Sequence, residues 1–333
     1  MGTIHLCAEQ TLVNGSTGDP VLYVDYVDSD NALLFDAGDN AALSMERLAD
    51  LRAVFITHHH VDHFIGLDRI VRANIDSDKV LSIFGPPHTI QKVYDRIRSY
   101  EYQFFPIQKI VLDLVEIEPH QLTRARIECT KRFPPPQPVS EPRTGRTIFS
   151  APGLTVEAVA VDHTVPCLAY ALVEAPAYHV KSTAIADGAL RPGPWIREVA
   201  QRLAASPIDD GSVTIQGLKI PLQQVAQQYF HRAEGGRLAY VTDTVWSETV
   251  QSDLIEFCRG ANRLYCDCFY AEAQANSAIK HKHMTTQTVA ELAIRAKVRE
   301  LILMHFSGRY RGRYEKLVDE VRGRFPHVSA QWA

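Results

Sequence analysis

The sequence predicts an α/β fold in which two mixed β-sheets pack face to face and carry helices on their outer surfaces. Short apolar runs typical of buried strands alternate with amphipathic helical patterns along most of the chain. Polar residues that can bind metal ions directly follow several of these runs, and such residues converge where strands end at one edge of a sheet. We therefore expect an αββα sandwich, formed as a single domain of residues 1–333.

The expected elements alternate in chain order. In the N-terminal half, the pattern predicts strands at 21–26, 32–35, 52–56 and 80–84, with helices at 64–73 and 89–100. In the C-terminal half, it predicts strands at 154–161, 168–173, 238–241, 263–266 and 300–304, with helices at 284–296 and 314–323. Residues 132–144, which include three consecutive prolines, predict a loop or insertion. Residues 174–234 show weaker strand signals and a Pro-Gly-Pro turn, and predict an arm-like excursion from the core.

Composition places the chain among ordinary globular proteins. It has 333 residues, of which 46% are hydrophobic and 22% charged, and its net charge of −4 does not indicate a general nucleic-acid binder. The six cysteines follow no framework spacing, which favours reduced thiols and a cytoplasmic protein. No apolar run is long enough to span a bilayer, so we expect no membrane partner.

The strongest functional signal is the segment Thr57-His58-His59-His60-Val61-Asp62-His63, which directly follows a predicted strand. His58 and His60 lie two positions apart on extended chain, so both rings can point the same way, and Asp62 and His63 follow as the chain enters a helix. Imidazole and carboxylate ligands suit Zn²⁺, Mn²⁺ or iron. Four ligands within six residues exceed what one catalytic metal can use, which favours two ions. His59 is on the opposite side of the run and is expected to be structural.

Three further candidate ligands end predicted strands downstream. They are His163, Asp243 and His305. One such residue alone is more often a hydrogen-bonded polar residue at a strand end. Three at equivalent places, together with the histidine cluster, favour a metal centre.

The motifs resemble those of the ribonuclease Z family of the metallo-β-lactamase superfamily, which trims tRNA precursors at the 3′ side. The histidine cluster is similar to the HxHxDH signature of the superfamily, and Asp36 matches an aspartate that supports the metal loop without binding the ions. The segments around His163, Asp243, His283 and His305 resemble the family's later motifs, and Leu190–Trp195 resembles the tip of its RNA-gripping arm. The resemblance covers residues 32–310.

The resemblance implies a site for two divalent ions, zinc in first place. One ion is expected on His58, His60 and His163, and the other on Asp62, His63 and His305, with Asp243 bridging them. Two such cations lower the pKa of a water towards about 7, so that it can attack a phosphodiester. Asp62 is expected to orient that water as general base, and His283 to protonate the leaving oxygen while Asp267 orients its ring.

Substrate contacts are expected at two places. Gly193 and Pro194 match the arm tip, whose apolar neighbours Trp195 and Ile196 would be costly to expose and favour a homodimer or another partner. Arg309 begins a stretch of basic and aromatic residues that can contact phosphate and stack on bases.

Two departures from the family leave the substrate open. The first twenty residues lack the family's glycine-rich opening loop, and Cys266-Asp267 stands where a His-Glu pair is usual. The leading prediction is an endoribonuclease acting on tRNA precursors. The alternatives are a hydrolase of a small ester, such as a cyclic nucleotide, arylsulfate or lactone, and a non-catalytic binding subunit.

Overall fold

The computed structural model describes residues 8–25, 32–103, 107–181, 191, 193–204 and 211–332. These residues form two compact units. Of the described residues, those within 8–150, 155–172 and 237–332 belong to the large unit, and those within 151–154 and 173–236 belong to the small unit. Within the described residues, no helix is long and apolar enough to cross a membrane.

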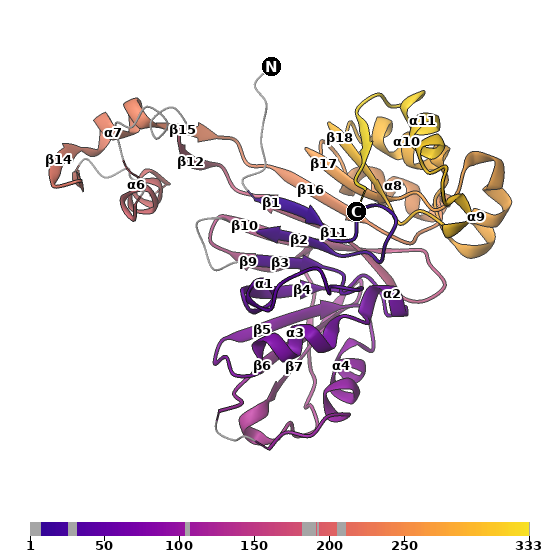
Figure 1. Ribbon diagram of the computed structural model, residues 1–333, viewed down its shortest axis with the longest axis horizontal. Helices are drawn as coiled ribbons and strands as arrows, with labels where there is room; N and C mark the ends of the chain where they lie inside the picture. The colour runs from indigo at the N-terminus through magenta and orange to yellow at the C-terminus, as the bar shows by residue number, and fades with distance from the viewer. Residues whose placement is uncertain are drawn as a thin grey trace. The chain divides into compact units, whose positions relative to one another are not determined.

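Two mixed sheets form the centre of the large unit (Figure 1). The first runs in chain order through β1 (Glu9–Leu12), β2 (Leu22–Asp25), β3 (Ala32–Phe35), β4 (Leu51–Phe55), β5 (Val80–Gly85), β6 (Val111–Ile117), β7 (Gln121–Glu128) and β8 (Val139–Pro142). The second has the order β19 (Val328–Ala330), β18 (Glu300–Met304), β17 (Arg263–Asp267), β16 (Arg237–Val241), β11 (Cys167–Glu174), β10 (Leu154–Val161) and β9 (Thr147–Ala151). Strands β3 to β6 are parallel, and so are β16 to β19.

Large aromatic side chains fill the space between the two sheets. Tyr170 of β11 lies 5.5 Å from Phe55 of β4 between ring centroids, and Tyr240 of β16 lies 5.8 Å from Phe35 of β3. The Tyr170 hydroxyl donates to the Ile56 carbonyl at 2.7 Å, which satisfies its polar atom inside the core. The sheets therefore pack face to face, as the sequence predicts.

Helices cover the outer face of each sheet. Alternate residues of the strands, such as Leu34 in β3 and Val241 in β16, point to those outer faces, as the period of two requires. The first sheet carries α1 (Met45–Ala49), α2 (Val61–Phe64), α3 (Leu67–Asn74) and α4 (Thr89–Arg98). The second carries α8 (Glu248–Phe257), α9 (Ala275–His281), α10 (Thr286–Arg295) and α11 (Glu315–Arg322). Short 3₁₀ turns lie at Cys129–Lys131, Glu272–Gln274 and Gly308–Tyr310. This confirms the αββα sandwich.

The small unit has its own apolar cluster. It contains two short hairpins, β12 (Ala177–Val180) with β15 (Phe230–Ala233), and β13 (Ser212–Ile215) with β14 (Leu218–Pro221), together with α6 (Trp195–Ala204) and α7 (Leu222–Tyr229). Trp195 is only 7% exposed and packs edge-on to Phe230. Trp195, whose exposure was expected to be too costly without a partner, is thus covered within this unit itself. The single-domain and arm assignments stay predictions, and part of the expected arm, residues 182–190, Pro192 and residues 205–210, lies outside the described residues.

Other differences from the sequence prediction are local. The helix expected at 64–73 is divided into α2 and α3 at Gly66, where a Cβ atom would lie 2.2 Å from the Gly38 carbonyl oxygen. The chain can therefore pass close to the loop after β3 only with glycine here. The loop expected at 132–144 contains the edge strand β8. The sequence prediction missed strands β1, β6, β7, β9 and β19 and helices α1, α8 and α9.

Candidate metal centre

The candidate ligands lie at the C-terminal ends of neighbouring strands in the large unit. His58 and its neighbours follow β4, His163 follows β10, Asp243 follows β16 and His305 follows β18. Parallel pairing of β16, β17 and β18 brings the ends of these strands to one edge of the second sheet (Figure 1). Strands β16 and β18 are almost completely buried, so each presents its terminal polar side chain on a rigid support.

One group of candidate ligands consists of His58, His60, His163 and Asp243. Each offers an atom, and these atoms all lie within 4.8 Å of one another. The Nε2 atoms of His58 and His163 lie 3.5 and 3.6 Å from Asp243 Oδ2. Three imidazoles and a carboxylate are a donor set that suits zinc.

A second group lies on the other side of Asp243. It contains Asp62, His63 and His305, again within 4.8 Å of one another. His63 Nε2 and His305 Nδ1 lie 3.7 and 2.9 Å from Asp243 Oδ1. His305 has φ 60, a left-handed conformation that is rare for a residue with a side chain and is found where the surroundings hold it. The two oxygens of Asp243 thus face different groups, which is the arrangement a bridging carboxylate needs.

A buried hydrogen-bond cluster around Asp36 orients the second group. Asp36 Oδ2 lies 2.8 Å from His63 Nδ1 and 3.1 Å from the Tyr240 hydroxyl, and Oδ1 accepts the Thr57 amide at 2.7 Å. With Nδ1 donating to this carboxylate, Nε2 of His63 carries its lone pair towards Asp62 and Asp243. A carboxylate behind a metal-binding histidine fixes the tautomer in this way.

Electrostatics at the centre favour positive charge between the carboxylates. Burial, reinforced by His63, lowers the pKa of His58 to about 2, so this imidazole is neutral as a metal ligand must be. Burial would lower the pKa of His305, but Asp243 raises it well above its usual value. Burial would likewise raise the pKa of Asp243, but His305 and His63 hold it well below. The carboxylates therefore remain ionised and stabilise any cation placed among them.

The residues fit two divalent ions. His63 Nε2 and His163 Nε2 are buried and have no hydrogen-bond partner among the described residues, although their Nδ1 atoms are bonded. A buried polar atom without a partner is costly, and one metal ion in each group would satisfy these two nitrogens. The cluster of imidazoles and carboxylates therefore indicates a site for divalent metal ions.

His283 lies in the turn between α9 and α10, and together with Asp243, Asp267 and His305 it offers side-chain atoms that all lie within 4.8 Å of one another. Its Nδ1 lies 3.0 Å from Asp267 Oδ2, and the same oxygen accepts the Met284 amide at 3.3 Å. Burial would lower the pKa of His283, but the Asp267 carboxylate raises it. The other oxygen of Asp267 lies 3.7 Å from His305 Nδ1, so Asp267 is close to both His283 and the second ligand group.

The remaining predicted residues are not members of the candidate ligand groups. Arg309 is exposed, lies 4.9 Å above the Tyr270 ring centroid and donates to Gln274. Gly193 and Pro194 precede α6 in the small unit. His59 points away from the ligands, and its Nε2 bonds the Thr89 hydroxyl at 3.0 Å. Their functional roles stay predictions, whereas the contact of His59 agrees with a structural residue.

Several neighbours of the site were not singled out from the sequence. Tyr240 and Thr57 bond Asp36, Lys282 contacts Asp162 and the His163 carbonyl, and Phe269 stacks on His283. Their signal in the sequence is only proximity, because each lies within three residues of a candidate site residue. Whether these residues contact the site depends on the direction of their side chains, and the pattern of apolar residues in the sequence does not give that direction.

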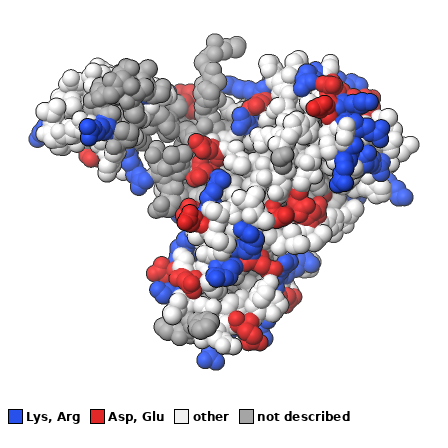
Figure 2. All heavy atoms as spheres, viewed as in Figure 1, with Lys and Arg blue, Asp and Glu red and all other residues white. Residues whose placement is uncertain are grey.

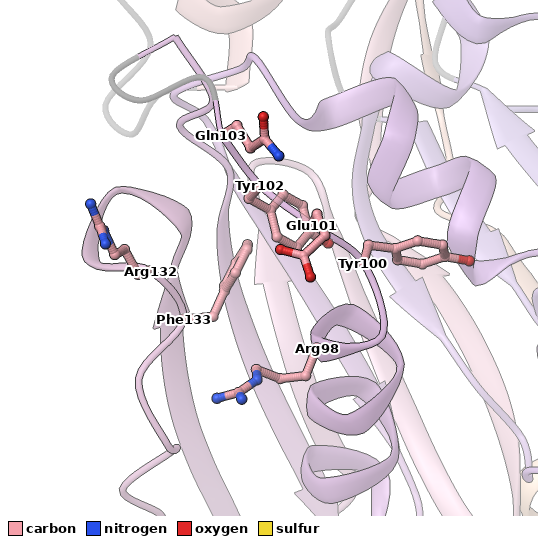
Figure 3. Close-up of a pocket in the computed structure, with 7 residues that line it drawn as sticks. All are labelled: Arg98, Tyr100, Glu101, Tyr102, Gln103, Arg132 and Phe133. Carbon is pink, nitrogen blue, oxygen red and sulfur yellow. The ribbon is translucent and has the colours of Figure 1, made fainter.

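A separate open pocket lies between the end of α4 and the turn after β7 (Figure 3). Arg98 and Arg132 approach it from different elements, while Tyr102 packs edge-on to the buried Phe133. None of its described lining residues belongs to the metal-ligand groups.

Comparison with known proteins places this geometry in context. Residues 31–189 match the model of the β-lactamase superfamily domain. A protein of Deinococcus radiodurans named ribonuclease Z is 30% identical over 302 residues, covering 89% of this chain and 88% of that protein. Two solved structures share the fold at 16% identity: a metallo-β-lactamase fold protein, YhfI, of Bacillus subtilis (TM-score 0.55, 96% of this chain and 95% of that one) and the short form of human tRNase Z (TM-score 0.51, 89% and 92%).

Proposed function

Because this chain belongs to the ribonuclease Z family of the β-lactamase superfamily, we propose that it is an endoribonuclease that removes the 3′ trailer of a tRNA precursor. The chain is a metal-dependent hydrolase. The observation that carries the RNA assignment is the family membership, joined to a site in which His283 lies beside two groups of candidate ligands.

The proposed ligands are His58, His60 and His163 for one ion and Asp62, His63 and His305 for the other, with Asp243 facing both. Zinc is the proposed metal, since the donors are imidazole and carboxylate. When bound, two such cations lower the pKa of water and stabilise the negative charge that develops on the phosphate.

The remaining chemistry belongs to the chain itself. Burial would raise the pKa of Asp62, but its hydrogen bond with His305 and the charge of His63 lower it, so the carboxylate is ionised. The Asp62 side chain is 37% exposed and can accept a hydrogen bond from the attacking water, which orients it towards phosphorus. His283 uses Nδ1 for Asp267, so Nε2 is the edge that can donate a proton to the leaving 3′-oxygen.

Exposed basic side chains near the site support an RNA substrate. Lys280, Arg309, Arg311 and Arg313 are all exposed; Lys280 lies near the end of α9 shortly before His283, and the three arginines follow His305. Figure 2 shows Lys and Arg gathered over the part of the large unit that carries α9 to α11. Phosphate contacts supply much of the affinity for nucleic acids, which makes binding dependent on salt. A cytoplasmic location and a homodimer remain part of the proposal.

The test compares a tRNA precursor carrying a 3′ trailer with bis-p-nitrophenyl phosphate, using protein loaded with zinc or manganese. We expect one cut at the 3′ side of the tRNA body, abolished by a chelator and restored by metal. Arg311→Gln should raise KM for the precursor more at low salt, where a phosphate contact contributes most to binding, and leave KM for the small ester unchanged. Hydrolysis of the small ester without any cleavage of the precursor would reject the RNA assignment and favour a small-ester hydrolase.

A further inference from the structure

We propose that Phe269 is a positioning residue for His283, holding the plane of its imidazole so that Nε2 faces the reacting phosphate. The proposal rests on the proposed function, in which His283 donates a proton to the leaving oxygen. Phe269 lies just after β17, two residues beyond Asp267, and its own side chain has no group that can transfer a proton.

The two rings are stacked. Their centroids are 4.1 Å apart and their planes differ by 17°, which is close contact over most of the imidazole face. Among the histidines of the centre, the other aromatic pairs are tilted or edge-on, including His283 with His163 and with His305. The stacked contact with Phe269 therefore differs from the tilted and edge-on contacts among the ligand rings.

Asp267 alone cannot fix the ring. Its bond to Nδ1 at 3.0 Å determines which nitrogen faces inwards, but hydrogen-bond angles vary widely, so a single bond leaves the ring some freedom to tilt about its side-chain torsions. A carboxylate on the short aspartate side chain, at the rigid end of β17, also has little freedom to follow the ring. A flat surface against one face of the imidazole removes the remaining rotation.

Phe269 is itself held in place. Its ring lies 5.0 Å from that of Tyr270 and 5.3 Å from that of His305, both tilted, so it is wedged between a buried tyrosine and the second ligand group. The His283 side chain is only 11% exposed under this cover. Asp267 thus holds the imidazole within the plane of its ring, and Phe269 holds it across that plane. Nε2 is the edge of the ring that remains free.

The experiment replaces Phe269 with leucine, which keeps an apolar group but removes the flat face. Misplacement of a reacting group costs up to about 10²-fold in rate, so we expect kcat on a tRNA precursor to fall roughly 10-fold to 10²-fold with little change in KM. Bis-p-nitrophenyl phosphate needs little protonation of its leaving group, and its kcat should fall much less. Phe269→Tyr, which retains the ring, should restore kcat.

Two controls separate positioning from other roles. In the His283→Ala background, Phe269→Leu should change kcat by no more than about twofold, because its effect acts through the missing imidazole. Phe325→Leu makes the same substitution at a buried phenylalanine that meets His327 edge-on away from the site, and should leave kcat unchanged. A loss that persists in the His283→Ala background would overturn the proposal, since Phe269 would then act on the RNA itself.

A measurement without turnover completes the test. In metal-free protein, the rate at which diethyl pyrocarbonate modifies His283, read by peptide mass spectrometry, should rise several-fold in Phe269→Leu and not in Phe269→Tyr or Phe325→Leu. If the modification rate of His283 were the same in Phe269→Leu as in the wild type, the proposal would be refuted, whatever the RNA cleavage assay had shown. Wild-type protein that cleaves neither substrate would instead refute the proposed function, so the two failures are distinguishable.

Discussion

Asp36→Asn tests the buried support of the second ligand group. Asp36 is fully buried, and the asparagine has the same shape, so the substitution changes chemistry without creating a cavity. Its amide oxygen can replace Oδ1 and still accept the Thr57 amide. Its amide nitrogen would then take the place of Oδ2, which contacts the Tyr240 hydroxyl and His63 Nδ1. Both of these groups donate a hydrogen bond to Asp36, so in the variant each would face another donor instead of an acceptor.

The size of the effect follows from these two contacts. A buried donor left without an acceptor costs about 1–3 kcal/mol, so the metal-free variant should be less stable by about 2–6 kcal/mol before relaxation. His63 can relieve one conflict by moving its proton to Nε2, but that proton then occupies the atom needed by the metal. Loss of such a partner typically weakens metal binding about 10–100-fold, or about 1.4–2.7 kcal/mol.

The assay is chelator competition read by calorimetry, with thermal unfolding of the metal-free protein alongside. One of two ions should bind more weakly, while the ion expected on His58, His60 and His163 keeps its affinity. Tyr240→Phe is the matched control, since it removes one of the same hydrogen bonds and leaves the contact between Asp36 and His63 intact. Equal weakening of both ions, or none, would refute the role assigned to Asp36.

The other predictions concern single residues of the two units. Asp243→Ala removes the oxygens that face both ligand groups and should leave fewer than two ions with almost no hydrolysis; elemental analysis showing full occupancy would contradict this. His283→Ala should keep both ions but slow RNA cleavage by about 10²–10⁴-fold, with a smaller loss on bis-p-nitrophenyl phosphate; loss of metal would make His283 a ligand instead. Trp195→Ala removes a buried ring packed on Phe230 and should destabilise the small unit by about 3–5 kcal/mol. In activity assays this variant should cleave the tRNA precursor more slowly and spare the small ester, whereas equal losses on both would assign the small unit a purely structural role.

Strongly patterned strands were predictable from sequence because burial on both faces leaves a continuous apolar run. Strand β18, expected at 300–304 and observed at Glu300–Met304, is such a run. Strand β7 alternates apolar residues with arginine, threonine and glutamine, and its polar face is too irregular to distinguish it from a helix or loop. The division of a predicted helix at Gly66 depends on a contact with Gly38, which no local pattern contains.

The candidate site could be predicted in part from the sequence for the same reason. Residues that end buried strands, such as Asp243 and His305, are brought together by parallel pairing, and the sequence contains both the strands and their terminal residues. The contacts that orient these residues could not be predicted from the sequence. Tyr240 reaches Asp36 across the space between the sheets, over a separation of 204 positions, and the direction of Phe269 depends on the turn after β17.

The members of the second ligand group lie far apart in the sequence, and this separation determines how late in synthesis and folding the group can assemble. Asp62 and His305 are separated by 243 positions, and His305 is placed only once β18 has paired with β17. During synthesis, the group of His58, His60, His163 and Asp243 is therefore complete in sequence before the second group has its last member. Contacts of such long range form late in folding, because closing the intervening chain costs entropy before any contact is gained. Metal binding at the second group is thus a late event, and added metal should slow unfolding more than it speeds refolding.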